Sequence, residues 1–179
     1  YLAYLEALVK NEVKINAGTL APYQIWSKYS EAGYGVKPYD ETLEQLWKNL
    51  PDTGSLSSTL VVADGSRSMN TTVGNSTVTA LDVAQSLAVY FGEKCQGEFK
   101  NKFITFSKRP QLVHFGLGRS LRSKIQITKQ YTEVSNTNIE KVFELVLQTA
   151  VTNKMPQAEL PETILIISDM EFDIASWDR

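Results

Sequence analysis

The chain has 179 residues, of which 42% are hydrophobic and 21% are charged, values that are ordinary for a globular protein. No apolar run approaches the roughly 20 residues that a membrane-spanning helix requires, so we expect no membrane partner. The single cysteine, Cys95, excludes an internal disulfide framework and favours an intracellular, cytoplasmic location.

The first part of the chain is predicted to be helical. Apolar residues recur at helical spacing from Leu2 to Val9. Pro22 suits the first turn of a second helix, and Asp40 is the expected cap of a third helix that stops before Pro51. We therefore expect a helical segment over residues 1–52, which is either the end of a longer α-helical region or a lid on the next domain.

The character of the sequence changes after residue 57. The continuous apolar runs Leu60–Ala63, Phe103–Phe106 and Ile164–Ile167 are typical of parallel strands that are buried on both faces. Pro110–Phe115 is predicted to be a short edge strand, because a proline cannot donate to a strand ladder.

Helical patterns separate these strands, over Ala80–Phe91, Arg119–Lys129 and Ile139–Ala150. Strands that alternate with helices indicate βαβ units. The sequence therefore predicts an α/β domain over residues 57–179, with a Rossmann-like, doubly wound and mostly parallel sheet.

Polar residues follow two of the predicted strands at the point where each strand ends. Asp64 and Asp169 end strands, and Ser66 and Ser68 follow Asp64 at alternate positions. Thr137 precedes the helix that leads into the last strand. Because the carboxyl ends of parallel strands share one edge of the sheet, these five side chains are expected to meet there.

Two carboxylates and three hydroxyls form an all-oxygen set. Such a set suits Mg²⁺, and also Mn²⁺ or Ca²⁺, whereas Zn²⁺ prefers nitrogen and sulfur ligands. With so little negative charge around it, the ion would stay electrophilic and could take a carboxylate from outside. We therefore expect a protein partner that supplies an exposed Asp or Glu.

This pattern resembles the von Willebrand factor A (vWA) domain and its metal-ion-dependent adhesion site (MIDAS), written Asp-x-Ser-x-Ser, then Thr, then Asp. The resemblance implies an α/β fold and a metal-dependent binding module without catalysis. The positions that match are Asp64, Ser66, Ser68, Thr137 and Asp169.

Four segments, KINAG, NKFITFS, NTNIEKVF and SDMEFD, look like an uncharacterised family of vWA proteins in plants, microbes and large viruses. That family is similar in layout to the Ro (TROVE-like) ribonucleoproteins, in which a helical region precedes the vWA domain. Two departures stand out. Arg67 replaces a glycine usual in close relatives and is expected to weaken metal binding. A complete vWA domain would also have about two more strand–helix units after Asp169, which implies an incomplete domain at the C-terminus.

The net charge of −2 conceals a basic stretch without any Asp or Glu. Such a stretch favours RNA as an alternative partner, although a solvated surface is the simpler interpretation. Its members are Lys100, Lys102, Lys108, Arg109, Arg119, Arg122, Lys124 and Lys129.

Simpler interpretations exist for the proposed ligands as well. Asp64 could cap the turn that follows its strand, and Thr137 with Glu140 fits a helix capping box. Among enzymes, phosphoryl transfer is the best alternative, because an aspartate after a buried strand is typical of aspartyl-phosphate chemistry. Such enzymes would normally carry a second carboxylate at position 66, which is a serine here. With one histidine and no nucleophile elbow or phosphate-binding loop, we expect no enzyme.

Overall fold

The structure is a computed structural model, and it describes residues 17–31, 35–52, 58–131 and 138–169. The helices are α2 (Pro22–Tyr29), α3 (Glu41–Lys48), α4 (Ala80–Lys94), α5 (Leu121–Thr128) and α6 (Ile139–Thr152). The strands are β1 (Thr59–Asp64), β2 (Lys102–Phe106), β3 (Leu112–His114) and β4 (Thr163–Ile167). Short 3₁₀ turns are η1 (Ser68–Asn70), η2 (Gly97–Phe99), η3 (Lys129–Tyr131) and η4 (Gln157–Glu159). The expected helix at Leu2–Val9 lies outside the described residues.

The four strands form one mixed sheet in the order β3-β2-β1-β4. β1 pairs in parallel with β2 on one side and with β4 on the other. β3 pairs antiparallel with β2 and lies at the edge, as the proline before it predicted. The predicted α/β class and the mostly parallel sheet are thus confirmed.

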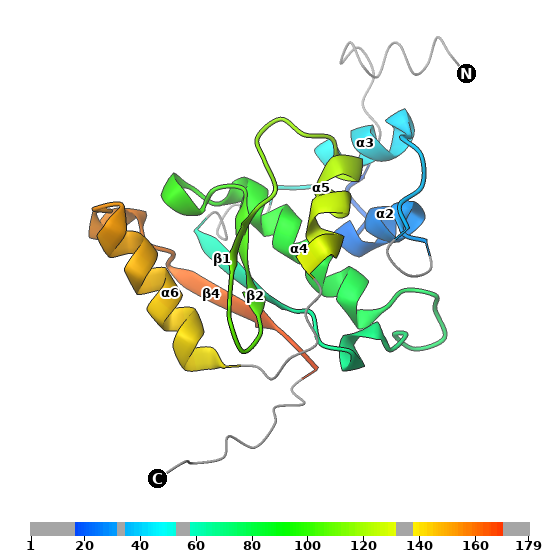
Figure 1. Cartoon of the computed structure of the whole chain (residues 1–179). Coiled ribbons are helices and arrows are strands. Elements are labelled where there is room, and N and C mark those ends of the chain that lie inside the picture. Colours follow the sequence, from blue (N-terminus) through cyan, green and yellow to red (C-terminus); the bar gives the residue numbers. More distant parts are fainter. Residues whose placement is uncertain (1–16, 32–34, 53–57, 132–137, 170–179) are drawn as a thin grey trace.

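Alternate residues of β1 face two different cores. Val61 and Ala63 pack in a cluster with apolar residues of α4, whereas Leu60 and Val62 pack with residues of α6. Figure 1 shows α6 apart from the group formed by α2, α3, α4 and α5. Burial on both faces explains why this strand is a continuous apolar run.

The apolar stripe of α6 is wider than the surface that it covers. Its buried residues are Val142, Val146 and Ala150. On the same helix, the exposed fractions are 50% for Ile139, 47% for Phe143, 61% for Leu147 and 76% for Val151. Because β4 is the last described strand on this side of the sheet, no described element reaches the outer half of the stripe.

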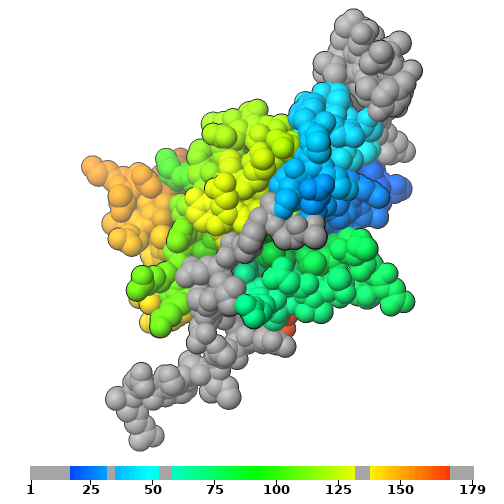
Figure 2. All heavy atoms as spheres, turned by 45° about the vertical axis from the view of Figure 1, so that its right-hand side comes forward, coloured from blue at the N-terminus to red at the C-terminus, as the bar shows by residue number. Residues whose placement is uncertain are grey.

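The two N-terminal helices belong to the same core as the sheet. The ring of Trp47 lies 6.4 Å from that of Trp26 and 6.2 Å from that of Tyr90, which joins α2 and α3 to α4. Figure 2 shows the surface of α2 and α3 (blue to cyan) next to that of α5 (yellow-green). The division of the chain between residues 52 and 57 stays a prediction.

A buried carboxylate ties α3 to α5. Glu44, which is only 3% exposed, accepts hydrogen bonds from the backbone N–H groups of Leu121 (2.7 Å) and Arg122 (3.1 Å). The hydroxyl of Tyr29 lies 2.9 Å from the same carboxylate. Burial and the nearby Glu44 raise the pKa of Tyr29, so the phenol stays protonated. Glu44 thus satisfies two donors at the start of α5 that no helical carbonyl can reach.

Replacing Glu44 by alanine should lower the free energy of unfolding by about 3 kcal/mol or more, because buried donors lose their acceptor at roughly 1–3 kcal/mol each. Urea denaturation measures this difference. The control is Glu41→Ala, one helical turn earlier. This variant loses an exposed hydrogen bond to Tyr39 and a partly buried one to Gln45. Because water can replace such bonds, the loss should be about 1 kcal/mol or less. Equal losses in the two variants would show that Glu44 does not hold α5.

Gly92 sits where α4 passes closest to the sheet. A Cβ atom here would lie 2.8 Å from the carbonyl oxygen of Lys102 and 2.9 Å from the ring of Phe115. In an open helix the change from glycine to alanine would stabilise by about 1 kcal/mol. Here the contact with backbone should reverse the sign.

We expect Gly92→Ala to lower the free energy of unfolding by about 1–3 kcal/mol, because the helix must move away from β2. Chemical denaturation and the melting temperature both report this. Gly74→Ala is the matched control, since its Cβ would meet nothing within 4 Å and only its positive φ of 57° opposes the change. A stabilised Gly92→Ala protein would contradict the close approach.

Candidate functional site

The candidate site lies at the carboxyl edge of the sheet, where the strand order reverses. From β1 the chain continues to β2 on one side, and it later reaches β4 on the other side. Figure 1 shows the ends of β1, β2 and β4 and the start of α6 at this same lower end of the molecule. Ligands of open α/β sheets bind at such a point.

Asp64 is the last residue of β1, and it is 2% exposed. One carboxylate oxygen accepts a hydrogen bond of 2.8 Å from the backbone N–H of Ser66, and the other accepts one of 2.6 Å from the hydroxyl of Ser168. The first bond is the turn-capping role that the simpler interpretation predicted. Within the described residues no Lys, Arg or His pairs with this carboxylate.

The two serines after Asp64 converge on one point. The hydroxyl oxygens of Ser66 and Ser68 are 2.9 Å apart, and both residues are half-buried. The loop has this shape because Asp64 holds the N–H of Ser66 and because η1 begins at Ser68. The structure therefore brings Asp64, Ser66 and Ser68 together as predicted.

Asp169 and Thr137 are placed less fully. β4 runs beside β1 with Ala63 opposite Ile167, which places Ser168 next to Asp64. Asp169 follows Ser168 and is exposed. Thr137 lies outside the described residues. The cap of α6 is Asn138, whose side chain accepts from the N–H of Lys141. The capping box that would begin at Thr137 lies outside the described residues.

Two hydroxyls at this edge were missed by the sequence analysis. Ser168 donates to Asp64, and the signal for it was its place between a strand and Asp169. Ser107 follows the residue of β2 that pairs with Asp64, it is 1% exposed, and its hydroxyl has no hydrogen-bond partner in the described structure. Both add oxygen donors to an edge that is already rich in them.

The donor atoms of the described residues are carboxylate and hydroxyl oxygens, which are suitable ligands for a hard divalent cation. The buried charge of Asp64 meets only neutral donors, whereas buried carboxylates are normally paired with a cation or bound to a metal. No group of three or more His, Cys, Asp and Glu side chains that could hold a metal occurs among the described residues. Any ion held here would thus depend on hydroxyls, as the sequence predicted. Arg67 lies between the serines with its side chain exposed.

The basic stretch does not form a single free surface. Lys124 is 9% exposed and pairs with Glu93, and Lys102 pairs with Glu98 at 3.5 Å. Other members donate to backbone carbonyls: Arg122 to that of Lys37 at 2.7 Å and Lys129 to that of Gly35 at 3.1 Å. Burial lowers the pKa of Lys129. Several of these cations therefore hold the fold together.

Within the described part of the chain, no helix has the length and apolar character needed to cross a membrane.

A protein of Acanthamoeba polyphaga mimivirus, "Uncharacterized protein L728", is 28% identical to this chain over 177 residues. The alignment covers 97% of this chain but only 29% of the viral protein. No solved structure matches the chain. The family model described as "Domain of unknown function (DUF7788)" matches residues 58–179, and the chain therefore belongs to that family.

Proposed function

We propose that the domain is a Rossmann-like vWA module whose carboxyl edge binds Mg²⁺, or Mn²⁺ or Ca²⁺, and through the ion an Asp or Glu side chain of a partner protein. The observation that supports this most is the buried carboxylate of Asp64, which no described cation neutralises. The converging hydroxyls of Ser66 and Ser68 lie just after it. Thr137 and Asp169 complete the proposed set.

The donor set favours capture of an acidic group over chemistry on a substrate. When bound, the ion supplies an electrophilic position for a carboxylate from outside. The lone His114 pairs with Lys102, the first residue of β2, and therefore lies at the opposite edge of the sheet. In the described structure, the serine hydroxyls thus lack the nearby histidine base that a hydrolase would use.

RNA binding through the basic stretch remains the second proposal, with weaker support. Of the eight basic residues, Lys102, Lys124, Arg122 and Lys129 are engaged within the chain. Reversing the charge of Lys124 or Arg122 would therefore disturb the fold as well as any RNA contact. Substitutions at the exposed Lys100 and Arg109 are the cleaner test of RNA affinity and of its dependence on salt.

Thermal unfolding with EDTA, Mg²⁺, Mn²⁺ or Ca²⁺ tests the metal proposal. An ion at a hundred times its dissociation constant should add about 2.7 kcal/mol to the stability of the parent protein. Asp64→Ala and Ser66→Ala should abolish that gain, whatever their stability in EDTA. Asp52→Ala should keep it, because the Asp52 side chain is 79% exposed and contacts Lys94, away from the carboxyl edge.

The comparison rests on the gain between EDTA and metal for each variant, so a loss of intrinsic stability in Asp64→Ala does not obscure it. A parent protein that melts at the same temperature with and without all three ions would contradict the metal site. Equal gains in the parent and in Asp64→Ala would show that the ion binds elsewhere.

A further inference from the structure

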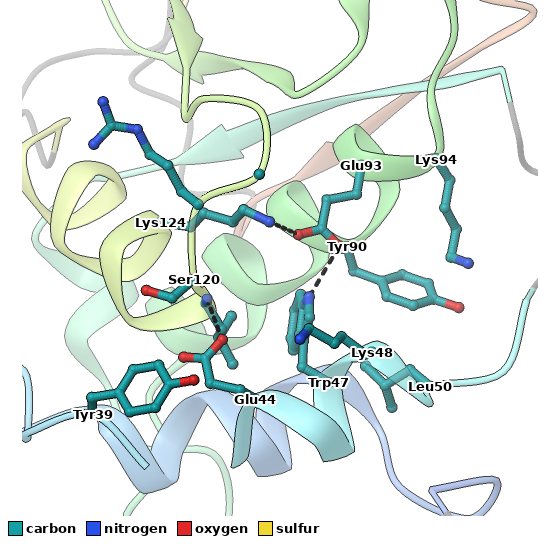
Figure 3. Close-up of a pocket in the computed structure, with 13 residues that line it drawn as sticks. Tyr39, Glu44, Trp47, Lys48, Leu50, Tyr90, Glu93, Lys94, Ser120 and Lys124 are labelled. Carbon is teal, nitrogen blue, oxygen red and sulfur yellow. Dashed lines mark hydrogen bonds and ion pairs between the residues drawn. The ribbon is translucent and has the colours of Figure 1, made fainter. Parts of the chain in front are cut away.

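A hollow of about 470 Å³ lies between α3, α4 and the start of α5. Figure 3 shows Tyr39 and Tyr90 on opposite sides of it, with Trp47 and Lys48 between them. Cavities of roughly 300–1,000 Å³ hold small ligands. One wall is the end of α4, which packs on the first residue of β2, whereas Asp64 pairs with the last residue of β2. The hollow and the candidate metal site therefore lie toward opposite ends of β2, which are about 13 Å apart along the strand.

The two acidic residues of the wall already have partners. Glu93 accepts a hydrogen bond of 3.0 Å from the indole N–H of Trp47 and pairs through its other oxygen with Lys124. Glu44 accepts from the start of α5, as described above. Neither carboxylate is left to attract a cationic ligand.

The basic residues of the wall are in excess. Four basic residues and two acidic ones line the hollow, which gives the lining itself a net charge of +2: Lys48, Lys94, Arg119 and Lys124, with Glu44 and Glu93. Lys48 is exposed and makes no hydrogen bond or ion pair with the described residues. The exposed Arg119 packs its side chain over Gly116, where a Cβ atom would lie 2.5 Å from its Nε. Lys94 contacts Asp52 at 3.1 Å, but Asp52 is 79% exposed, and such surface pairs are weak. The hollow therefore favours an anion.

The second feature of the hollow is a set of aromatic rings in its wall. Tyr39 is 54% exposed, and its hydroxyl donates to Glu41 over 2.6 Å, which holds the ring in place. This bond to a carboxylate raises the pKa of Tyr39 to about 12. The rings of Trp47 and Tyr90 form the remaining aromatic wall, and the ammonium of Lys94 lies 5.0 Å from the centre of the Tyr90 ring. A planar ring can stack on such surfaces.

We propose that this hollow binds a small anion that carries a planar aromatic ring, of the chemical class of a nucleoside monophosphate. The phosphate lies at Lys48, and the ring stacks on Tyr39. The N–H groups at the start of α5 do not take part, because Glu44 and the hydroxyl of Ser120 already accept from them. Recognition therefore depends on exposed side chains, and affinity falls as ionic strength rises.

Isothermal titration calorimetry with adenosine monophosphate tests this proposal. EDTA is present throughout, so that an ion at the carboxyl edge does not contribute. The parent protein should bind the nucleotide, and adenosine or inorganic phosphate alone should bind at least about tenfold more weakly, since each lacks one half of the contacts. Lys48→Glu and Tyr39→Ala should each weaken binding about tenfold, the loss expected for one charged contact or one stacked ring.

Lys28→Glu is the matched control, because Lys28 is an exposed lysine on α2 that does not line the hollow, and its affinity should equal that of the parent. No binding of the nucleotide to the parent at about 1 mM, an affinity of roughly 4 kcal/mol, would overturn the proposal. Binding that Lys48→Glu and Tyr39→Ala leave unchanged would overturn it too, because the nucleotide would then occupy another surface.

Discussion

The backbone pairing of β1 with strands on both sides is the constraint on which the rest of the structure depends. Its parallel ladders to β2 and β4 bury all six residues of the strand, so both faces of the sheet need helices. The same pairing sets the register that places Ser168 beside Asp64. A shift of β4 by one residue would turn Ser168 to the other face and leave one carboxylate oxygen without its donor. The same strand register therefore determines both the packing of the core and the residues that meet at the carboxyl edge.

Local patterns were enough to predict most of the described elements and three neighbouring residues of the candidate site. The continuous apolar runs identify β1, β2 and β4, and proline restricts β3 to the edge. Asp64, Ser66 and Ser68 are close in sequence, so a single turn brings them together. Ser168 and Ser107 depend on which strand lies next to which, and no local pattern carries that information. Thr137 lies outside the described residues, so its part in the site stays a prediction.

Charge was harder to interpret from sequence than apolar pattern. The basic stretch of residues 100–129 is continuous along the chain, but several of its partners are distant in sequence. They are Glu93 for Lys124, and backbone carbonyls of the N-terminal loops for Arg122 and Lys129. Long basic side chains bury their stems and bring their charged ends to such acceptors. An excess of basic over acidic residues lies instead around the hollow between α3, α4 and α5.

The helix α4 separates two chemically opposite ends of the molecule. Its N-terminus follows the loop of the two serines, where Asp64 is a buried negative charge without a described cation. Its C-terminus carries Glu93 and Lys94 into the hollow, where Lys48 is a positive charge without an ion-pair partner among the described residues. Gly92 and the indole of Trp47 hold this end rigidly against β2 and α3. A cation at one end and an anion at the other would therefore bind to preformed surfaces. The two ends of β2 are about 13 Å apart, which is longer than the screening length of about 8 Å at physiological salt, so each ion should bind without strong electrostatic help from the other.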